Sequence, residues 1–279
     1  MNQPTYPNLR QSLLLVLFFF GSYGLFSFLT GALPQLLGWQ LSGLYMISMK
    51  SINPVCILPL VLYISYKSGI QIKWRVKLPG IQLVSLLILL AFAGFIIAYP
   101  LARPVNYWHE LMAGRIKIMT LLIADWNPER VINMIGGVLL VPIFEEIFWR
   151  KQILGLLLKR YSPVVGILVN SVLFALGHGR LHDIGSLIIW GLLFGVVYYQ
   201  TNSIEASILT HAITNLFSNA TKHGFMESNG FPLFKYIAVM VVCALVIYLI
   251  IKNLDKYRLV REDTVVHEKS NEGSDLSSI

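Results

Sequence analysis

The sequence contains few charged residues for its length. Asp, Glu, Lys and Arg make up 13% of its 279 residues, whereas about a quarter of a soluble domain is charged. Hydrophobic residues make up 56%, and the mean hydropathy is +0.66. This composition excludes an ordinary soluble fold and predicts a chain whose solvent is the lipid bilayer.

Cysteine is also scarce. Cys56 and Cys243 are the only two, and both lie in apolar stretches, so we expect neither a disulfide framework nor a cysteine-rich metal site. The formal net charge of +8 does not indicate a nucleic-acid partner, because the cations lie in short loops between apolar segments and not on one solvated face. We expect lipid and membrane-bound molecules as partners, and no nucleic acid.

Apolar runs long enough to cross a bilayer recur along the chain, since a transmembrane helix needs about 20 residues. The expected spans are residues 12–32, 42–66, 81–102, 129–159, 162–178, 184–199, 204–220 and 233–251. The first run is longer than a signal-peptide core, and we expect it to be retained. Lys50, Pro54 and Pro59 interrupt the second, which we expect to be broken or partly re-entrant. The predicted fold class is all-α, a polytopic membrane protein of about eight transmembrane helices.

The chain divides into four predicted parts. Residues 1–128 hold the first three helices and a connecting loop, 129–220 form a core with the polar motifs, 221–252 contain the last transmembrane helix, and 253–279 form a tail that we expect to be disordered. Lys and Arg gather after the second, fourth and eighth helices. By the positive-inside rule this face is cytoplasmic. We therefore expect a multi-pass cell-membrane protein with both termini in the cytoplasm.

The core carries ionisable residues where a bilayer makes them costly. A charged side chain at mid-membrane costs about 3 kcal/mol on insertion scales, so such residues persist mainly where they pair or function. Residues 142–150 read Pro-Ile-Phe-Glu-Glu-Ile-Phe-Trp-Arg. Glu146 and Arg150 stand one helical turn apart and can form an ion pair. Glu145 then remains for other chemistry.

Two further helices carry polar stripes at spacings of four residues, which place side chains on one face. The stripes are Asn170, Phe174 and His178 in the fifth helix and Ser207, His211 and Asn215 in the seventh. At a rise of about 1.5 Å per residue, Glu145 and His178 lie at similar depths from the cytoplasmic ends of their helices. His211 lies nearer its own end, so the seventh helix must start deeper, tilt or contribute from below.

These groups can hydrolyse a peptide bond, which requires an activated water, a general base and donors for the oxyanion. In one arrangement Glu145, assisted by His178, deprotonates the water, while His211 and Asn215 donate hydrogen bonds to the oxyanion and no metal is needed. In the other, Glu145 or Glu146 joins His178 and His211 as ligands of a zinc ion that keeps an open position for water. The residues alone leave both arrangements open.

The three patterns resemble the motifs of the CAAX-protease and bacteriocin-processing (CPBP, Abi) family. The motifs EExxxR, FxxxH and HxxxN occur in the family's order at Glu145, Glu146 and Arg150, at Phe174 and His178, and at His211 and Asn215. Each is weak alone, but the ordered set inside apolar helices is specific. The resemblance implies an eight-helix fold and an intramembrane endopeptidase that acts on a membrane-bound peptide or protein.

Roles for single residues also follow from this resemblance. It implies Glu145 as the water activator with His178, His211 and Asn215 as oxyanion donors, and Glu146 as a residue that orients the site together with Arg150. We favour a glutamate mechanism without a cofactor for such a family, with zinc as the alternative. The family includes eukaryotic CAAX prenyl endopeptidases and bacterial members that act in peptide maturation or bacteriocin immunity.

Two other classes of function remain open on the sequence. A non-catalytic immunity or scaffold protein would keep the fold and bind a partner helix, and the pair of Glu146 and Arg150 would then simply hold the bundle. A proton-coupled transporter would use the acidic and imidazole groups as a relay. Transporters usually show paired repeats, and none is evident here.

Overall fold

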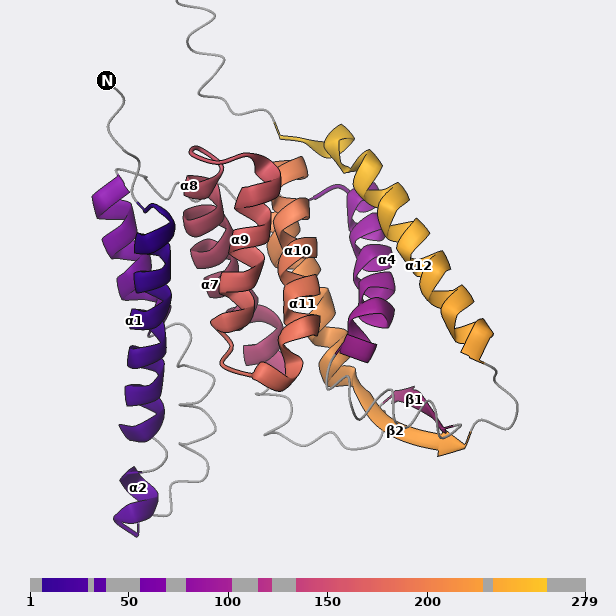
Figure 1. Ribbon diagram of the computed structural model, residues 1–279, viewed down its shortest axis with the longest axis horizontal. Coiled ribbons are helices and arrows are strands. Elements are labelled where there is room, and N and C mark those ends of the chain that lie inside the picture. The colour runs from indigo at the N-terminus through magenta and orange to yellow at the C-terminus, as the bar shows by residue number, and fades with distance from the viewer. Residues whose placement is uncertain are drawn as a thin grey trace, which may run out of the picture.

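The chain folds into a bundle of helices (Figure 1). A computed structural model describes residues 7–29, 33–38, 56–68, 79–101, 115–121, 134–227 and 233–259. In its first part lie α1 (Leu9–Ser27), the short α2 (Leu33–Leu36), a helix over Cys56–Ser68, and α4 (Ile81–Ala98), which continues into the 3-10 turn η2 (Tyr99–Leu101).

The second part contains the helices with the polar motifs. One long helix changes its winding along its length, through the π-helical η3 (Gly136–Leu140), α7 (Val141–Glu146), the π-helical η4 (Ile147–Leu154) and α8 (Gly155–Leu157). It is followed by α9 (Pro163–Leu176), the 3-10 turn η5 (Leu181–Asp183), α10 (Ile184–Thr201), α11 (Ile204–Ala220), α12 (Leu233–Leu254) and the 3-10 turn η6 (Asp255–Tyr257).

The predicted all-α membrane fold is confirmed. Four described helices are long and apolar enough to cross a membrane, over Leu9–Phe26, Ile81–Leu101, Leu181–Thr201 and Ile237–Tyr257, and two shorter apolar helices cover Cys56–Ser68 and Pro163–Gly177. The protein is therefore a multi-pass membrane protein. Lys50 and Pro54, on which the expected break in the second helix partly depended, lie outside the described residues. Pro59 lies within the helix described over Cys56–Ser68.

Local sequence signals set several helix ends. Asn8 caps α1 through a capping box, in which its side chain accepts from Gln11 N at 2.9 Å and its own N–H donates to the Gln11 side chain at 2.8 Å. Ser162 precedes Pro163 at the start of α9. Asn202 adopts a left-handed φ of 52° and ends α10, so α11 begins after only two linking residues.

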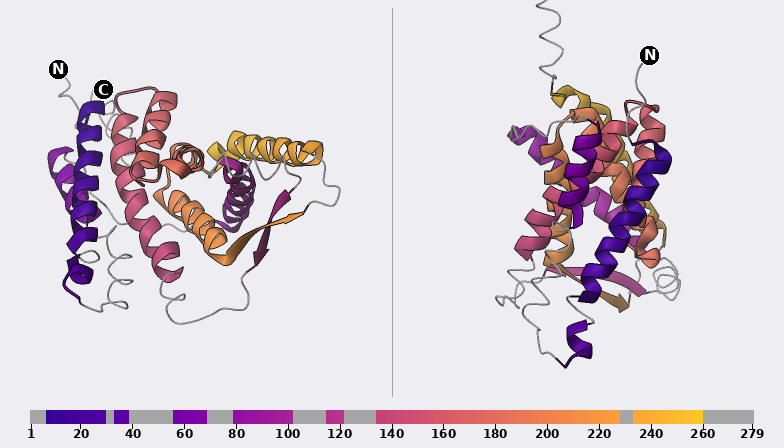
Figure 2. Two further views of the ribbon diagram at one scale, coloured as in Figure 1. Left: turned by 60° about the horizontal axis from the view of Figure 1, so that its bottom comes forward. Right: turned by 90° about the vertical axis from the view of Figure 1, so that its left-hand side faces the viewer.

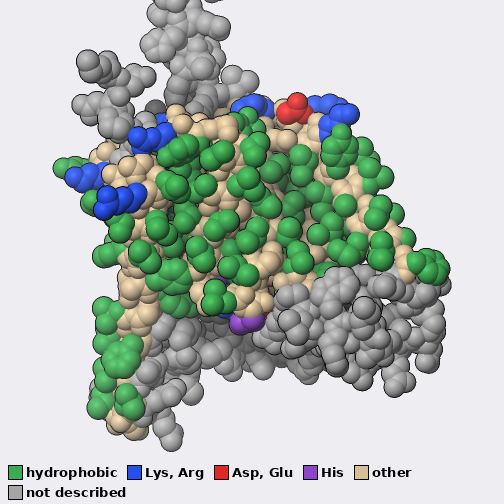
Figure 3. All heavy atoms as spheres, viewed as in Figure 1, with side chains coloured by type: hydrophobic (Ala, Val, Ile, Leu, Met, Phe, Trp, Pro, Cys, Tyr) green, Lys and Arg blue, Asp and Glu red, His purple; other side chains and the backbone are tan. Residues whose placement is uncertain are grey.

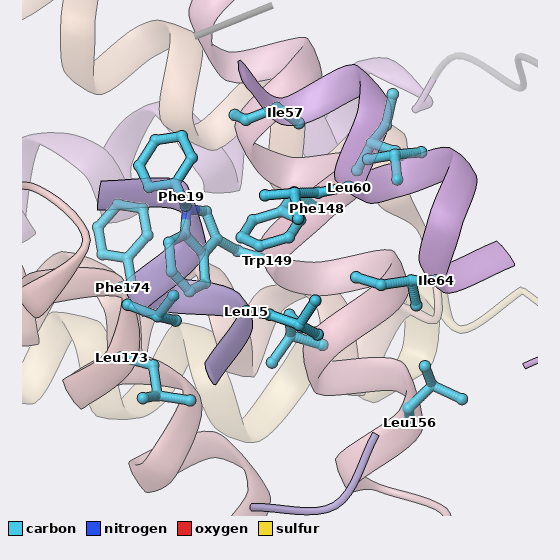
Figure 4. Packing of buried hydrophobic residues seen from close by; sticks show 14 of the residues in the cluster. Leu15, Phe19, Ile57, Leu60, Ile64, Phe148, Trp149, Leu156, Leu173 and Phe174 are labelled. Atoms are coloured by element: carbon cyan, nitrogen blue, oxygen red, sulfur yellow. The ribbon is translucent and has the colours of Figure 1, made fainter. Parts of the chain in front are cut away.

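Two apolar clusters hold the bundle together. The first joins α1, the helix over Cys56–Ser68, the long motif helix, α9 and α10, and Figure 4 shows Phe19, Phe148 and Trp149 packed within it. The second joins α4, α10, α11 and α12. Because α10 belongs to both clusters, it lies at the centre of the bundle.

Close packing of α10 on α9 depends on two glycines at a spacing of four. A Cβ atom on Gly191 would lie 2.8 Å from the backbone Cα of Ser171, and one on Gly195 would lie 3.2 Å from a methyl group of Ile167. The GxxxG pattern predicts this close approach of two helices, and the structure confirms it.

A small β-ladder lies at one end of the bundle and was not expected from the sequence. Strands β1 (Arg115–Leu121) and β2 (Thr221–Glu227) pair antiparallel, with Arg115 opposite Glu227. β2 continues directly from α11, at the lower end of the bundle in Figure 1. The partners are more than 100 residues apart, which is why local patterns do not predict the pairing.

The other end of the bundle holds both ends of the described chain, as Figure 2 also shows. Lys and Arg side chains gather along this end in Figure 3. The predicted disordered tail begins too early at residue 253. The helix α12 runs to Leu254 and η6 to Tyr257, and the backbone N–H of Leu259 donates to Thr201 O at 2.9 Å while Asn202 Nδ2 donates to Leu259 O at 3.0 Å. Residues 260–279 lie outside the described part.

Candidate active site

The two neighbouring carboxylates of the first motif lie at the junction between α7 and the π-helical η4. Glu145 is 6% exposed and Glu146 is fully buried. Consecutive residues in a helix point about 100° apart, so the two side chains face different neighbours. Glu146 faces α11, and Glu145 faces the end of α9.

Glu146 is the centre of a buried polar cluster. Ser207 Oγ donates to its Oε2 at 2.6 Å, His211 Nδ1 lies 2.8 Å from its Oε1, and Arg150 Nε lies 3.1 Å from Oε2. The ion pair with Arg150 that the spacing predicts is confirmed. Because a carboxylate has two oxygens and both are engaged, Glu146 is held firmly between its own helix and α11.

Arg150 is also fully buried, and aromatic rings surround its charge. Its guanidinium carbon lies 4.5 Å from the ring centre of Phe174 and 5.4 Å from that of Phe194. Such cation–π contacts are strongest where water is excluded. The phenylalanine of the second motif therefore supports the arginine of the first.

Glu145 meets the histidine of the second motif. Its Oε2 lies 3.8 Å from His178 Nε2, which is too long for a direct hydrogen bond. His178 Nδ1 lies 2.9 Å from the carbonyl oxygen of Phe174. Since a carbonyl oxygen can only accept, Nδ1 carries a proton, and in the neutral ring Nε2 presents its lone pair towards Glu145.

The third motif lies on α11 beside the same region. His211 reaches Glu146, so the seventh helix contributes to the site although His211 lies only seven residues from Ile204, where α11 begins. Asn215 Nδ2 donates to the carbonyl oxygen of Gly137 at 2.8 Å. One of the two Nδ2 protons makes this hydrogen bond, and the other points away from the Gly137 oxygen.

A cavity of about 630 Å³ connects the histidines and the asparagine. His178, His211 and Asn215 all line it. The remaining walls come from η2 and the end of α4, from α10, and from the last turns of α11, and include Tyr99, Asp183, Trp190, Thr214 and Ser218. The second and third motifs therefore line one cavity, and the first motif joins them through the contacts of Glu145 with His178 and of Glu146 with His211.

Several polar residues outside the predicted set support this geometry. Ser207 stood in the polar stripe of the seventh helix, and its spacing of four from His211 was the signal for its contact with Glu146. Asn170 Nδ2 donates to Trp149 O at 2.9 Å, and Gln152 Nε2 donates to Val61 O and to Ser65 Oγ, both at 2.8 Å. No local pattern marks Gln152, because its partners lie about 90 residues away.

The side chains do not fit the zinc alternative. Within the part of the chain that the structure describes, no three His, Cys, Asp or Glu side chains gather closely enough to hold a metal ion. Both oxygens of Glu146 are engaged by Ser207 and His211. We therefore derive no chemical step through a metal.

The motif segment is also similar to known proteins. Residues 127–217 match the family model of the Rce1-like type II CAAX prenyl endopeptidases. The CPBP resemblance is confirmed for this segment. The chain is 31% identical over 137 residues to a Bacillus subtilis (strain 168) protein named "Putative membrane peptidase YdiL", an alignment that covers 48% of this chain and 56% of that relative. The chain thus spans little more than half the length of the curated relative it matches.

Proposed function

We propose that the protein is an intramembrane endopeptidase that hydrolyses a peptide bond in a membrane-associated or hydrophobic substrate. The observation that carries the proposal is the pair of Glu145 and His178, 3.8 Å apart, beside a cavity that His211 and Asn215 also line. A buried carboxylate, two imidazoles and an amide are the groups that peptide hydrolysis requires. The names of the matching family and of the Bacillus relative support the same class of reaction.

In this proposal Glu145 and His178 activate the water. Because Nε2 of the neutral His178 ring and the carboxylate of Glu145 both accept hydrogen bonds, a water beside them can donate one proton to each. Its lone pair then points away from both groups and towards a substrate carbonyl carbon. Glu145 takes a proton as the water oxygen attacks, and His178 positions the water.

The residues of the third motif, His211 and Asn215, stabilise the oxyanion in this proposal. His211 Nδ1 donates to Glu146, so the ring can donate from Nε2 as well only as an imidazolium, whose charge the Glu146 carboxylate stabilises. The second amide proton of Asn215 supplies another donor. When the C–N bond of the tetrahedral intermediate breaks, Glu145 returns its proton to the leaving amine. The products are a carboxylic acid and an amine, and no other reactant is needed.

The decisive test removes the proton acceptor and keeps its size. Glu145→Gln in purified protein, reconstituted into liposomes with a quenched hydrophobic peptide, should lower kcat by about 10³-fold, within the range for a lost general base. Glu205→Gln, at the start of α11 and away from the cavity, is the matched control and should keep full activity. Full activity in the Glu145 variant would remove the proposed role.

A second test concerns the cofactor. We expect that a strong zinc chelator leaves cleavage unchanged and that purified protein carries zinc well below one ion per chain. Elemental analysis of the same preparation measures the metal. A chelated enzyme that loses activity and regains it with added zinc would contradict the metal-free mechanism and leave the protease assignment in place.

A further inference from the structure

The cavity opens at one particular end of the bundle. Its deepest walls are Phe174 and Phe194, each 1% exposed, and His211 at 5%, whereas Arg180 and Ser218 at its mouth are exposed. Arg180 follows the end of α9, and Ser218 lies in the last turn of α11. These helix ends lie at the end of the bundle that carries the β-ladder (Figure 1).

Three of the site residues, Glu145, His178 and Asn215, lie in the half of the bundle next to this mouth. Glu145 is 14 residues, about 21 Å along the helix, from Lys159, but only 9 residues, about 14 Å, from Gly136. His178 follows the C-terminal end of α9 directly. Asn215 lies five residues, about 8 Å, from the end of α11 at Ala220. Glu145, His178 and Asn215 therefore lie nearer the mouth than the opposite end, whereas His211 lies near the middle of α11, seven residues from Ile204 and nine from Ala220.

That opposite end is basic. We call it the basic rim, and its exposed cations in the described residues are Arg10, Lys67, Lys159, Arg160, Lys252, Lys256 and Arg258. Figure 3 shows Lys and Arg along this end. The connection at residues 69–78, between two helix ends of the same side, adds three more cations in sequence, Lys73, Arg75 and Lys77.

The mouth end carries a different balance of charge. In sequence, its connections at 28–55, 102–133, 177–183 and 221–232 contain seven Lys or Arg together with five Asp or Glu: Lys50, Arg103, Arg115, Lys117, Arg130, Arg180 and Lys222, and Glu110, Asp125, Glu129, Asp183 and Glu227. The connections at the basic rim are shorter and more uniformly cationic. Because short basic loops stay in the cytoplasm, the basic rim marks the cytoplasmic side.

We propose that the cavity opens to the extracytoplasmic side of the membrane, and that its substrates are membrane-anchored peptides whose scissile bond lies on that side. The substrate class rests on the proposed endopeptidase function. A lipidated C-terminus on the cytoplasmic face is then not the substrate, although the name of the matching family refers to CAAX prenyl endopeptidases. The peptide reaches the water at Glu145 past Arg180 and Ser218.

Cysteine accessibility tests the orientation without any need for catalysis. Cys56 and Cys243 are buried and are replaced by Ala. A single cysteine is then introduced at the mouth, Ser218→Cys, or at the basic rim, Lys159→Cys, both exposed positions. Intact cells and lysed cells are treated with a membrane-impermeant maleimide. We expect labelling of Ser218→Cys in intact cells and of Lys159→Cys only after lysis.

The opposite pattern, or labelling of both cysteines in intact cells, would overturn the proposal. Arg180→Cys provides a second mouth position if Ser218→Cys stays unreactive after lysis. The same labelling in a Glu145→Gln background shows that the result is independent of activity. The orientation therefore stands or falls separately from the enzyme assignment.

Sided vesicles test the substrate class. A water-soluble peptide with one membrane-anchoring acyl chain is added to right-side-out vesicles and to inverted vesicles that contain the protein. We expect cleavage to be at least tenfold faster in right-side-out vesicles than in inverted vesicles. Once detergent has opened both kinds of vesicle, the two rates should be equal. Faster cleavage in inverted vesicles would overturn the proposal. Absence of cleavage in detergent would instead contradict the endopeptidase function.

Discussion

Glu145 and Glu146 are neighbours in the chain but have different surroundings. Glu146 is fully buried and has three partners within 3.1 Å, on its own helix and on α11. Glu145 faces a histidine at 3.8 Å, beyond hydrogen-bond distance, next to the cavity wall. A carboxylate with both oxygens fixed is suited to holding helices together, and one that faces an imidazole beside a cavity is suited to accepting a proton. The motif therefore combines a structural carboxylate, Glu146, and a proposed general base, Glu145, in consecutive positions.

The largest effect on stability should come from Glu146. Glu146→Gln leaves the buried Arg150 without its counter-charge, which should lower the free energy of unfolding by about 3–5 kcal/mol. Detergent-induced unfolding of the purified protein measures the change. In the same assay Glu145→Gln should change stability less than Glu146→Gln, because it leaves the 3.1 Å contact between Glu146 and Arg150 in place. Equal stability of the two variants would end the distinction between the carboxylates.

A double variant separates charge from structure. Glu146→Gln with Arg150→Met removes both buried charges and keeps similar volume, so much of the lost stability should return. Cleavage should stay low, because the His211 imidazolium no longer has a carboxylate beside it. Recovery of both properties would show that Glu146 has no part in positioning His211.

The two histidines offer the next comparison. His178→Ala and His211→Ala should each lower kcat by about 10²-fold, through loss of water positioning and of an oxyanion donor. His211→Ala should also lower stability by about 1–3 kcal/mol, because it removes a buried partner of Glu146. His178→Ala should change stability less. Paired kinetic and unfolding measurements check this, and equal destabilisation would contradict it.

Ser207 should give the smallest effect. Ser207→Ala removes the 2.6 Å hydrogen bond to Glu146 and should lower stability by about 1.5 kcal/mol, the usual value for a hydrogen bond to a charged group. Thr210→Val is the matched control, since the Thr210 hydroxyl donates to Ala206 O within its own helix at 2.8 Å. Unfolding of both variants in one detergent series gives the difference. If Thr210→Val lowers stability as much as Ser207→Ala does, the hydrogen bond from Ser207 to Glu146 contributes no more than a hydrogen bond within one helix.

Local periodicity predicted much of this molecule. The helix expected at 204–220 has those ends in the structure, and the pair of Glu146 and Arg150 follows from a spacing of four. The sequence could not assign each imidazole to its carboxylate, because this depends on the depth and rotation of α11. Counting residues along the seventh helix from Ser203 places His211 at a smaller depth than Glu145 and His178, yet His211 contacts Glu146. The contact of Gln152 with Val61 joins distant stretches of chain, and no local signal reports it.

The change of winding within the motif helix has a consequence for its evolution and engineering. A π-helical stretch bonds i to i+5 and accommodates an additional residue in its turn, and here it follows Glu146 directly. The residues before it face α9 and α11, while Gln152 within it faces the helix over Cys56–Ser68. Removing one residue from 147–154 lets this stretch rewind as an α-helix, in which fewer residues complete the same turn, so the rest of the helix keeps its direction relative to Glu145. A single deletion here should therefore be tolerated better than one in α7, which would turn Gln152 by about 100° away from its partners Val61 and Ser65.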